Sequence, residues 1–261
     1  MLEIKDLTIQ YGDKPPVVEN FSLSLKKGEI ITIVGESGSG KSTVLSSILG
    51  LLPNGGKIIS GDIIYNGESM LNKSLNQWRE LRGTEITMIS QDSGGTLNPI
   101  RKIGKQFVEY IQTHSKMSAK EAEEKAKDMF SKVNLPDPEI IMKSYPHQLS
   151  GGMKQRVGIA MALTFHPKII LGDEPTSALD VITQAQIVKE IMDLRKKFDT
   201  SIIMVTHNLG VAAYISDKII VMQNGKIVDA GNKNEVIENP KSEYTKKLLE
   251  AVPEIGGERL V

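Results

Sequence analysis

Apolar and polar residues alternate along the start of the chain, at residues 2–9 and again at 17–25. A period of two is that of a β-strand with one buried face, and the turn-forming residues 12–16 separate the two runs. We therefore predict two antiparallel strands, the basis of an N-terminal antiparallel β subdomain, and a further strand at residues 58–64.

Short runs rich in apolar residues recur along the rest of the chain, at residues 30–34, 85–89, 169–171, 202–205 and 219–222. Such runs are typical of strands buried on both faces. Helical patterns lie between some of them, at residues 44–49 and 183–198. The alternation predicts an α/β fold with a mainly parallel sheet, helices on both of its faces, and a ligand site at the carboxyl ends of the strands.

Residues 98–143 differ from the rest, because they are helical in pattern and rich in charge. Apolar residues form one stripe along this segment, at Ala122, Ala126, Met129, Phe130 and Val133. We predict an inserted α-helical subdomain here. A surface excursion with a solvated charged face fits the same residues, but the length of the segment favours a subdomain.

Composition restricts the function. With 261 residues, the chain can form one large domain or a core with an inserted subdomain. Lys+Arg and Asp+Glu both number 32, so no overall field attracts nucleic acid or an anionic membrane. The absence of cysteine excludes disulfides, thiolate metal sites, iron–sulfur clusters and cysteine nucleophiles. With neither a secretory signal nor an apolar run of about 20 residues, we expect any membrane contact to go through a partner.

Residues 35–43 follow the apolar run 30–34 and fit the pattern G-x-x-x-x-G-K-[S/T]. In this pattern, glycines let backbone N–H groups point inward around a polyphosphate at the positive end of the next helix. Lys41 then reaches the β- and γ-phosphates, and the Ser42 hydroxyl ligates Mg²⁺. A simple Gly/Ser-rich turn is the alternative, which the flanking strand and helix disfavour. The nucleotide-binding residues expected here are Gly35, Glu36, Ser37, Gly38, Ser39, Gly40, Lys41, Ser42 and Thr43.

Two carboxylates, Asp173 and Glu174, follow the apolar run 169–171. At the end of such a strand, one acidic residue can hold the water shell of Mg²⁺ and the next can take a proton from attacking water. We predict that Asp173 serves the metal and that Glu174 is the general base. An acidic loop after a buried strand is the alternative, and the phosphate loop makes it the weaker one.

Residues 149–155 open another helix, with Ser150 as its N-cap and with Gly151 and Gly152 exposing backbone N–H groups. Alone, this segment is an ordinary helix start. Together with the first loop, it is a second anion site in one chain. Two such sites suggest two copies working face to face, each completing the site of the other.

The motifs of this chain, in the order in which they occur, resemble those of the nucleotide-binding subunit of ATP-binding cassette (ABC) transporters over about residues 1–230. One departure is Met153, where the family signature loop usually has glutamine. The matches are the Walker A loop at 35–43, the Q-loop at Gln91, the signature loop at 149–153, the Walker B strand at 169–174, the D-loop at 177–180, the switch histidine His207, and the adenine-stacking aromatic Tyr11.

The resemblance implies a P-loop NTPase (RecA-like) core in a single ABC ATPase domain over residues 1–261. The catalytic core lies at about 1–95 and 155–230, the helical subdomain at about 96–154, and a C-terminal helical tail at 231–261, with helices at 234–238 and 242–251.

The resemblance also implies that two such domains clamp two ATP molecules with Mg²⁺. Ser150, Gly151 and Gly152 of one domain would reach the γ-phosphate held by Lys41 of the other, and Asp180 belongs to the same family set. Gln91 would touch Mg²⁺ or the attacking water, and His207 the γ-phosphate or Glu174. For Gln91, a polar strand-end residue is the alternative. For Tyr11, an ordinary strand aromatic is nearly as good an explanation.

Local details resemble the branch that imports oligopeptides, dipeptides and nickel, namely residues 96–99, 150–156 and 244–253. Many peptide importers of this branch have a cysteine-containing C-terminal extension. The sequence does not contain one, which slightly favours nickel or metallophore import. The expected partners are two integral-membrane permease subunits, an extracytoplasmic substrate-binding protein and a second ATP-binding subunit, either a paralogue or a second copy. The expected location is the cytoplasmic face of the cell membrane, with no nucleic-acid partner.

Two other functions compete with transport. A soluble ABC-type ATPase acting on DNA or ribosomes is disfavoured, because the chain has no long heptad insertion, no zinc cysteines and no basic net charge. A nucleotide-dependent regulatory module without turnover is disfavoured by the presence of both Glu174 and His207.

Overall fold

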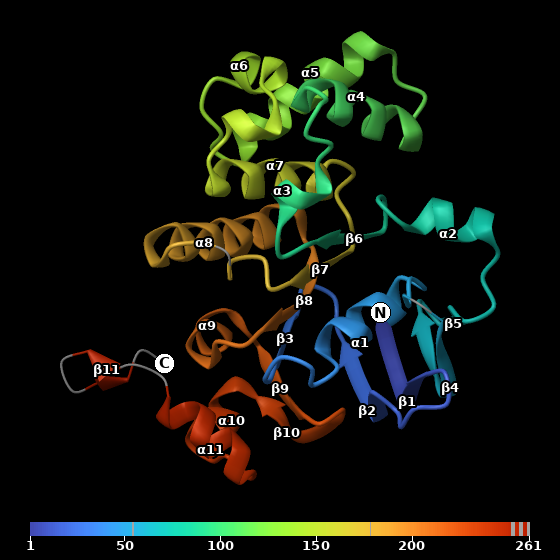
Figure 1. Cartoon of the computed structure of the whole chain (residues 1–261), viewed down its shortest axis with the longest axis vertical. Helices are drawn as coiled ribbons and strands as arrows, with labels where there is room; N and C mark the ends of the chain where they lie inside the picture. Colours follow the sequence, from blue (N-terminus) through green and yellow to red (C-terminus); the bar gives the residue numbers. More distant parts are fainter. Residues whose placement is uncertain (54, 178, 252–253, 256–257, 260–261) are drawn as a thin grey trace. The chain divides into compact units, whose positions relative to one another are not determined.

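The computed structural model describes residues 1–53, 55–177, 179–251, 254–255 and 258–259 (Figure 1). The chain divides into two compact units, one formed by Met1–Trp78 with Ser201–Val261 and the other by Arg79–Thr200. Within the described residues, no helix combines the length and the apolar character needed to cross a bilayer.

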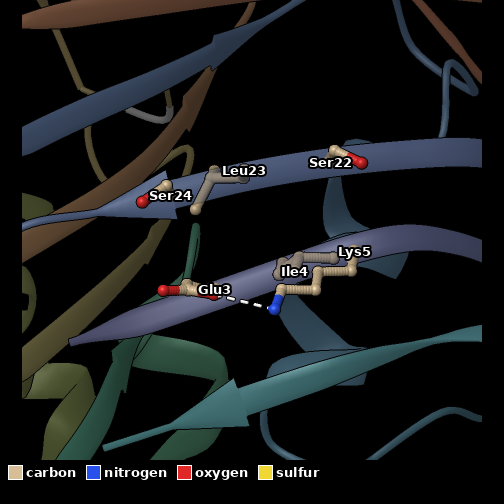
Figure 2. Close-up of a pocket in the computed structure, with 6 residues that line it drawn as sticks. All are labelled: Glu3, Ile4, Lys5, Ser22, Leu23 and Ser24. Carbon is tan, nitrogen blue, oxygen red and sulfur yellow. Dashed lines mark ion pairs between the residues drawn. The ribbon is translucent and has the colours of Figure 1, made fainter. Parts of the chain in front are cut away.

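An antiparallel sheet opens the first unit, as the alternating pattern predicts. Its strands lie in the order β2 (Val18–Leu25), β1 (Leu2–Tyr11), β4 (Gly56–Tyr65) and β5 (Glu68–Ser69). On β1 and β2 the paired residues Ile4 and Leu23 are buried. These two strands line a pocket of about 390 Å³, in which Glu3 and Lys5 form an ion pair at 3.2 Å. Figure 2 shows the six residues that line the pocket.

The first unit also contains four strands in the order β10 (Lys226–Asn232), β9 (Lys218–Gln223), β3 (Ile30–Val34) and β8 (Ser201–Thr206). β3 is buried along its whole length and pairs in parallel with both β8 and β9. The mainly parallel sheet is thus confirmed. β10, which pairs antiparallel with β9, was not predicted, because its sequence KIVDAGN lacks a continuous apolar run.

Helices of the first unit follow its strands. α1 (Lys41–Ile48) comes after β3, and α9 (Leu209–Ile215) comes after β8. The expected tail helices are present as α10 (Lys233–Glu238) and α11 (Glu243–Glu250). Beyond them, β11 (Glu254–Ile255) and β12 (Glu258–Arg259) pair antiparallel.

The second unit combines two parallel strands with a set of helices. β6 (Ile86–Ile89) pairs with β7 (Ile169–Asp173), in a register that sets Ile86 against Ile169. The helices, including α2 at the boundary of the two units, are α2 (Leu75–Leu81), α3 (Ser93–Thr96), α4 (Ile103–His114), α5 (Ala119–Lys132), α6 (Pro138–Lys143), η1 (Pro146–Gln148), α7 (Gly151–Leu163) and α8 (Val181–Phe198).

The apolar stripe predicted along residues 122–133 is the buried face of α5 and its C-cap. All of its members are fully or almost fully buried. Phe130 packs on Phe107 of α4, with ring centroids 5.2 Å apart. At its start, α5 has a capping box in which Ser118 and Glu121 satisfy each other's backbone N–H groups. The helical segment thus has a hydrophobic core, and a merely solvated excursion does not describe it.

Candidate nucleotide site

The predicted phosphate loop, residues 35–43, connects β3 to α1, and its last three residues form the first turn of the helix. Gly40 is the N-cap of α1 and has φ of 98°, a left-handed conformation that favours glycine. At Gly35, a Cβ atom would lie 2.2 Å from the backbone oxygen of Met222 on β9. A side chain at Gly35 would therefore displace the loop from the strand.

A backbone hydrogen bond joins this loop to the turn between β9 and β10. The Gly225 N–H, in the turn between β9 and β10, donates to the Ser39 carbonyl at 3.2 Å. The Gly225 carbonyl in turn accepts from the Glu19 N–H of β2 at 2.9 Å. Segments distant in the sequence thus hold the loop, and no local pattern encodes these bonds.

Lys41 is buried in the loop, with 4% of its surface exposed. Its Nζ donates to the Gly35 and Glu36 carbonyl oxygens at 2.7 Å each, and lies 3.5 Å from the Ser39 Oγ. Among the described residues, α1 has no acidic residue in its first turn and no side-chain cap. A buried cation beside the N-terminus of this helix fits the phosphates of a nucleotide.

His207 lies at the same edge of the first unit as the phosphate loop. Val34 of β3 pairs in parallel register with Thr206 of β8. The loop begins directly after Val34 and His207 directly after Thr206, so the two follow paired positions. His207 is exposed, and the following Asn208 caps α9 with its side chain.

Tyr11 ends β1 and lies opposite Gly56 of β4. Its ring covers this glycine, where a Cβ atom would lie 2.6 Å from the Tyr11 Cε1. Glycine at this position leaves room for the Tyr11 ring. The stacking of Tyr11 on adenine stays a prediction.

Gln91 and the two carboxylates Asp173 and Glu174 lie at one edge of the second unit. Ile89 of β6 pairs in parallel register with Gly172 of β7. Gln91 comes shortly after the first of these paired residues, and the two carboxylates come directly after the second. Glu174 has φ of 46°, which is uncommon for a residue other than glycine. Its carbonyl accepts from the N–H and the Oγ of Ser177, at 3.2 and 3.1 Å, in a tight turn.

The signature segment and the end of the D-loop also meet within the second unit. Ser150 caps α7 as predicted, its Oγ accepting from the Met153 N–H at 3.3 Å. Asp180 accepts from the N–H and the hydroxyl of Thr183, at 3.0 and 2.7 Å. At Gly152, a Cβ atom would lie 2.9 Å from the Thr183 Cγ2. Ala178 of the D-loop is outside the described residues.

Gln155 is a residue that the sequence reasoning missed. It lies on α7 with 3% of its surface exposed, donates from Nε2 to the Ser90 carbonyl at 3.2 Å, and accepts from the Ser93 N–H at 3.4 Å. The two residues that Gln155 contacts lie before and after Gln91 in the sequence. The sequence feature that could have identified Gln155 is a glutamine close to the apolar residues of this helix.

Replacing Gln155 with leucine is expected to destabilise the chain by about 1–3 kcal/mol, because the mutant leaves the Ser90 and Ser93 backbone groups without this partner. Urea unfolding measures the change. The matched control is Gln112→Leu, at an exposed glutamine of α4 whose hydrogen bond to the Met117 carbonyl is open to solvent, and it is expected within about 0.5 kcal/mol of the native chain. Equal stability of the two variants would show that the Gln155 contacts contribute nothing.

Comparison with known proteins identifies the family. Residues 18–177 match the family model described as ABC transporter. The chain belongs to the ABC transporter family. It is therefore an ATPase of the ABC type, and the expected P-loop α/β fold and the expectation of ATP as its nucleotide are confirmed.

Similar proteins extend this ABC match over nearly the whole chain. The oligopeptide transport ATP-binding protein OppD of Bacillus subtilis is 44% identical, over 97% of this chain and 72% of its own length. The metal-staphylopine import system ATP-binding protein CntD of Staphylococcus aureus is 41% identical, over 95% of this chain and 92% of its own length.

Among solved structures, cbiO1 of Clostridium perfringens, part of the ABC transporter complex cbiONQ, has a TM-score of 0.79 and 27% identity, over 97% of this chain and 95% of its own. The ATP-binding cassette MJ0796, in a dimeric post-hydrolysis state bound to ADP and Pi, has a TM-score of 0.77 and 29% identity, over 89% of this chain and 99% of its own.

Proposed function

We propose that this chain is the ATP-hydrolysing subunit of an importer, which energises the uptake of peptides, or of nickel or another metal chelate, through membrane subunits. The observation that carries the proposal is similarity over 95–97% of the chain to the ATP-binding subunits of an oligopeptide transporter and a metal-staphylopine importer. The alternative of an ABC-type ATPase acting on nucleic acid or ribosomes is not favoured, because these relatives serve transport.

In this proposal, the first unit holds the phosphates. Lys41 places its ammonium against the β- and γ-phosphates, and the backbone N–H groups from Gly38 to Thr43 surround them. Support comes from the burial of Lys41 and from the left-handed Gly40 at the start of α1. His207 follows the strand next to the loop and contacts the γ-phosphate or orients the base.

Mg²⁺, when bound, supplies positive charge to the phosphates as they separate. Ser42, Gln91 and Asp173 are the residues that would hold it, and hydroxyl, amide and carboxylate oxygens are the donors this ion prefers. Glu174 accepts the proton of the attacking water. Gln91 and Glu174 follow paired positions of β6 and β7, which supports a shared role at that edge.

A partner ATPase subunit completes the site in this proposal. Ser150, Gly151 and Gly152 of one chain close on the γ-phosphate held by the other, and Asp180 belongs to the same surface. The packing of Gly152 on Thr183, which Asp180 caps, supports a joint surface formed by the starts of α7 and α8. The partner is a paralogue or a second copy, and MJ0796 itself is a dimeric cassette.

The remaining partners are two permease subunits and an extracytoplasmic substrate-binding protein, with this chain on the cytoplasmic face of the membrane. We expect that purification of the tagged chain from detergent-solubilised membranes recovers integral-membrane subunits in fixed proportion. The control is the same tag on an unrelated cytosolic protein. Repeated recovery of ribosomes or DNA in place of membrane subunits would contradict the transport function.

The cargo class is tested by uptake. Cells that lack this gene are supplied with labelled di- and oligopeptides or with a nickel chelate, and the native gene is compared with its Glu174→Gln variant. Uptake restored only by the native gene identifies the cargo. Restoration of neither class by the native gene would refute the cargo proposed.

A further inference from the structure

Both backbone groups of Glu36, in the phosphate loop, are held by side chains. The Glu36 N–H donates to the Tyr244 hydroxyl at 2.9 Å, and the Glu36 carbonyl accepts from the Lys41 Nζ at 2.7 Å. Tyr244 lies on the tail helix α11, 208 residues further along the chain. The family model ends at residue 177, so it does not include this contact.

Buried polar contacts fix the start of the tail helix that carries Tyr244. Asp229 of β10 is 5% exposed, and its Oδ2 accepts from the Lys241 and Ser242 N–H groups at 2.8 and 3.3 Å. The Ser242 Oγ then caps α11 by accepting from the Tyr244 N–H at 3.1 Å. The position of the tyrosine is therefore set from the sheet, through Asp229.

Hydrophobic packing joins the tail to the strand that leads into the loop. Val34, the last residue of β3, shares a buried cluster with Leu249 of α11. Tyr244 and Leu248 pack against the same cluster. α11 contacts α9 and β10, and all three belong to the first unit (Figure 1).

We propose that Tyr244 is a positioning residue for the nucleotide site, its hydroxyl fixing the Glu36 backbone and thereby the carbonyl that orients the Lys41 ammonium. A loop ordered before binding does not lose conformational entropy when the nucleotide arrives, so the hydroxyl raises affinity without touching the phosphates. The inference rests on the proposed assignment of residues 35–43 as the phosphate site.

The alternative is a purely structural tyrosine, whose ring fills space in the tail. The two roles reside in different atoms. The ring packs on the cluster around Val34, whereas only the oxygen reaches the Glu36 N–H. Removing the oxygen alone, by Tyr244→Phe, therefore separates them, because phenylalanine keeps the ring.

The test measures the dissociation constants of MgATP and MgADP for the full chain by fluorescence titration with labelled nucleotides. We expect Tyr244→Phe to raise both by about five-fold, since a single hydrogen bond is lost and both nucleotides carry the β-phosphate that the loop surrounds. The kcat for ATP is expected to stay within about two-fold, since the hydroxyl does not contact the reacting atoms. Tyr214→Phe, at an exposed tyrosine of α9, is the matched control and should change neither constant.

Unchanged nucleotide affinity in Tyr244→Phe would overturn the inference, whether or not the urea midpoint of the variant falls. Weakened affinity with an unchanged midpoint supports it. If the native chain binds no nucleotide, the phosphate site itself fails and this inference with it. Measuring the native chain first makes these two failures distinguishable.

Discussion

Glu174→Gln is expected to reduce ATP hydrolysis by about 10²–10⁴-fold while leaving MgATP binding within about two-fold of the native value. Glutamine has the size of glutamate but cannot accept the proton of the attacking water. The main-chain turn at Glu174 is held through its carbonyl by Ser177, and this contact does not depend on the side chain. The variant should therefore keep its fold and lose only the base.

Phosphate release at saturating MgATP measures the loss, and titration with a labelled nucleotide checks that binding is retained. The matched control is Glu109→Gln, at an exposed glutamate of α4 whose ion pair with Arg101 is open to solvent. An exposed pair of this kind contributes little to stability. Turnover of the Glu174 variant equal to that of the control would remove Glu174 as the general base.

Local pattern was sufficient wherever a residue's role depends on its sequence neighbours. An apolar strand, a glycine-rich loop and a helix in succession predicted the course of β3, the phosphate loop and α1. A serine before two glycines predicted the N-cap of α7. These features follow from backbone geometry and capping, which act over a few residues.

The missed features depend on contacts between distant segments. β10 is an edge strand that contains the buried Asp229. The Asp229 side chain accepts a hydrogen bond from the backbone just before the tail helix α11, and this contact explains a polar residue at a buried strand position. Gln155 bonds to residues more than 60 positions away, at Ser90 and Ser93. The assignments of Gln91, Asp173, Glu174 and His207 to particular steps stay predictions.

For Lys41, the local sequence pattern predicts the role, and contacts in the structure explain how the buried ammonium group is held in place. The residue is 4% exposed, and its Nζ is held by the Gly35 and Glu36 carbonyl oxygens. Burying an ammonium is costly unless it is hydrogen-bonded, and these carbonyls supply the bonds. The charge is thus fixed beside the N-terminus of α1, and a helix N-terminus favours the binding of an anion such as phosphate.

Lys41→Ala is accordingly expected to weaken MgATP binding by about 100-fold or more, because hydrogen bonds to a charged group contribute about 1.5–3 kcal/mol each and 1.4 kcal/mol is a factor of ten. Fluorescence titration measures the loss, with Lys14→Ala, at an exposed lysine of the same unit, as the control. Lys41→Met retains most of the aliphatic volume, so it separates loss of the charge from loss of packing. If both Lys41 variants bind MgATP as the control does, the phosphates do not lie in this loop. If Lys41→Ala alone is weakened, the aliphatic stem rather than the ammonium holds the loop in its binding conformation.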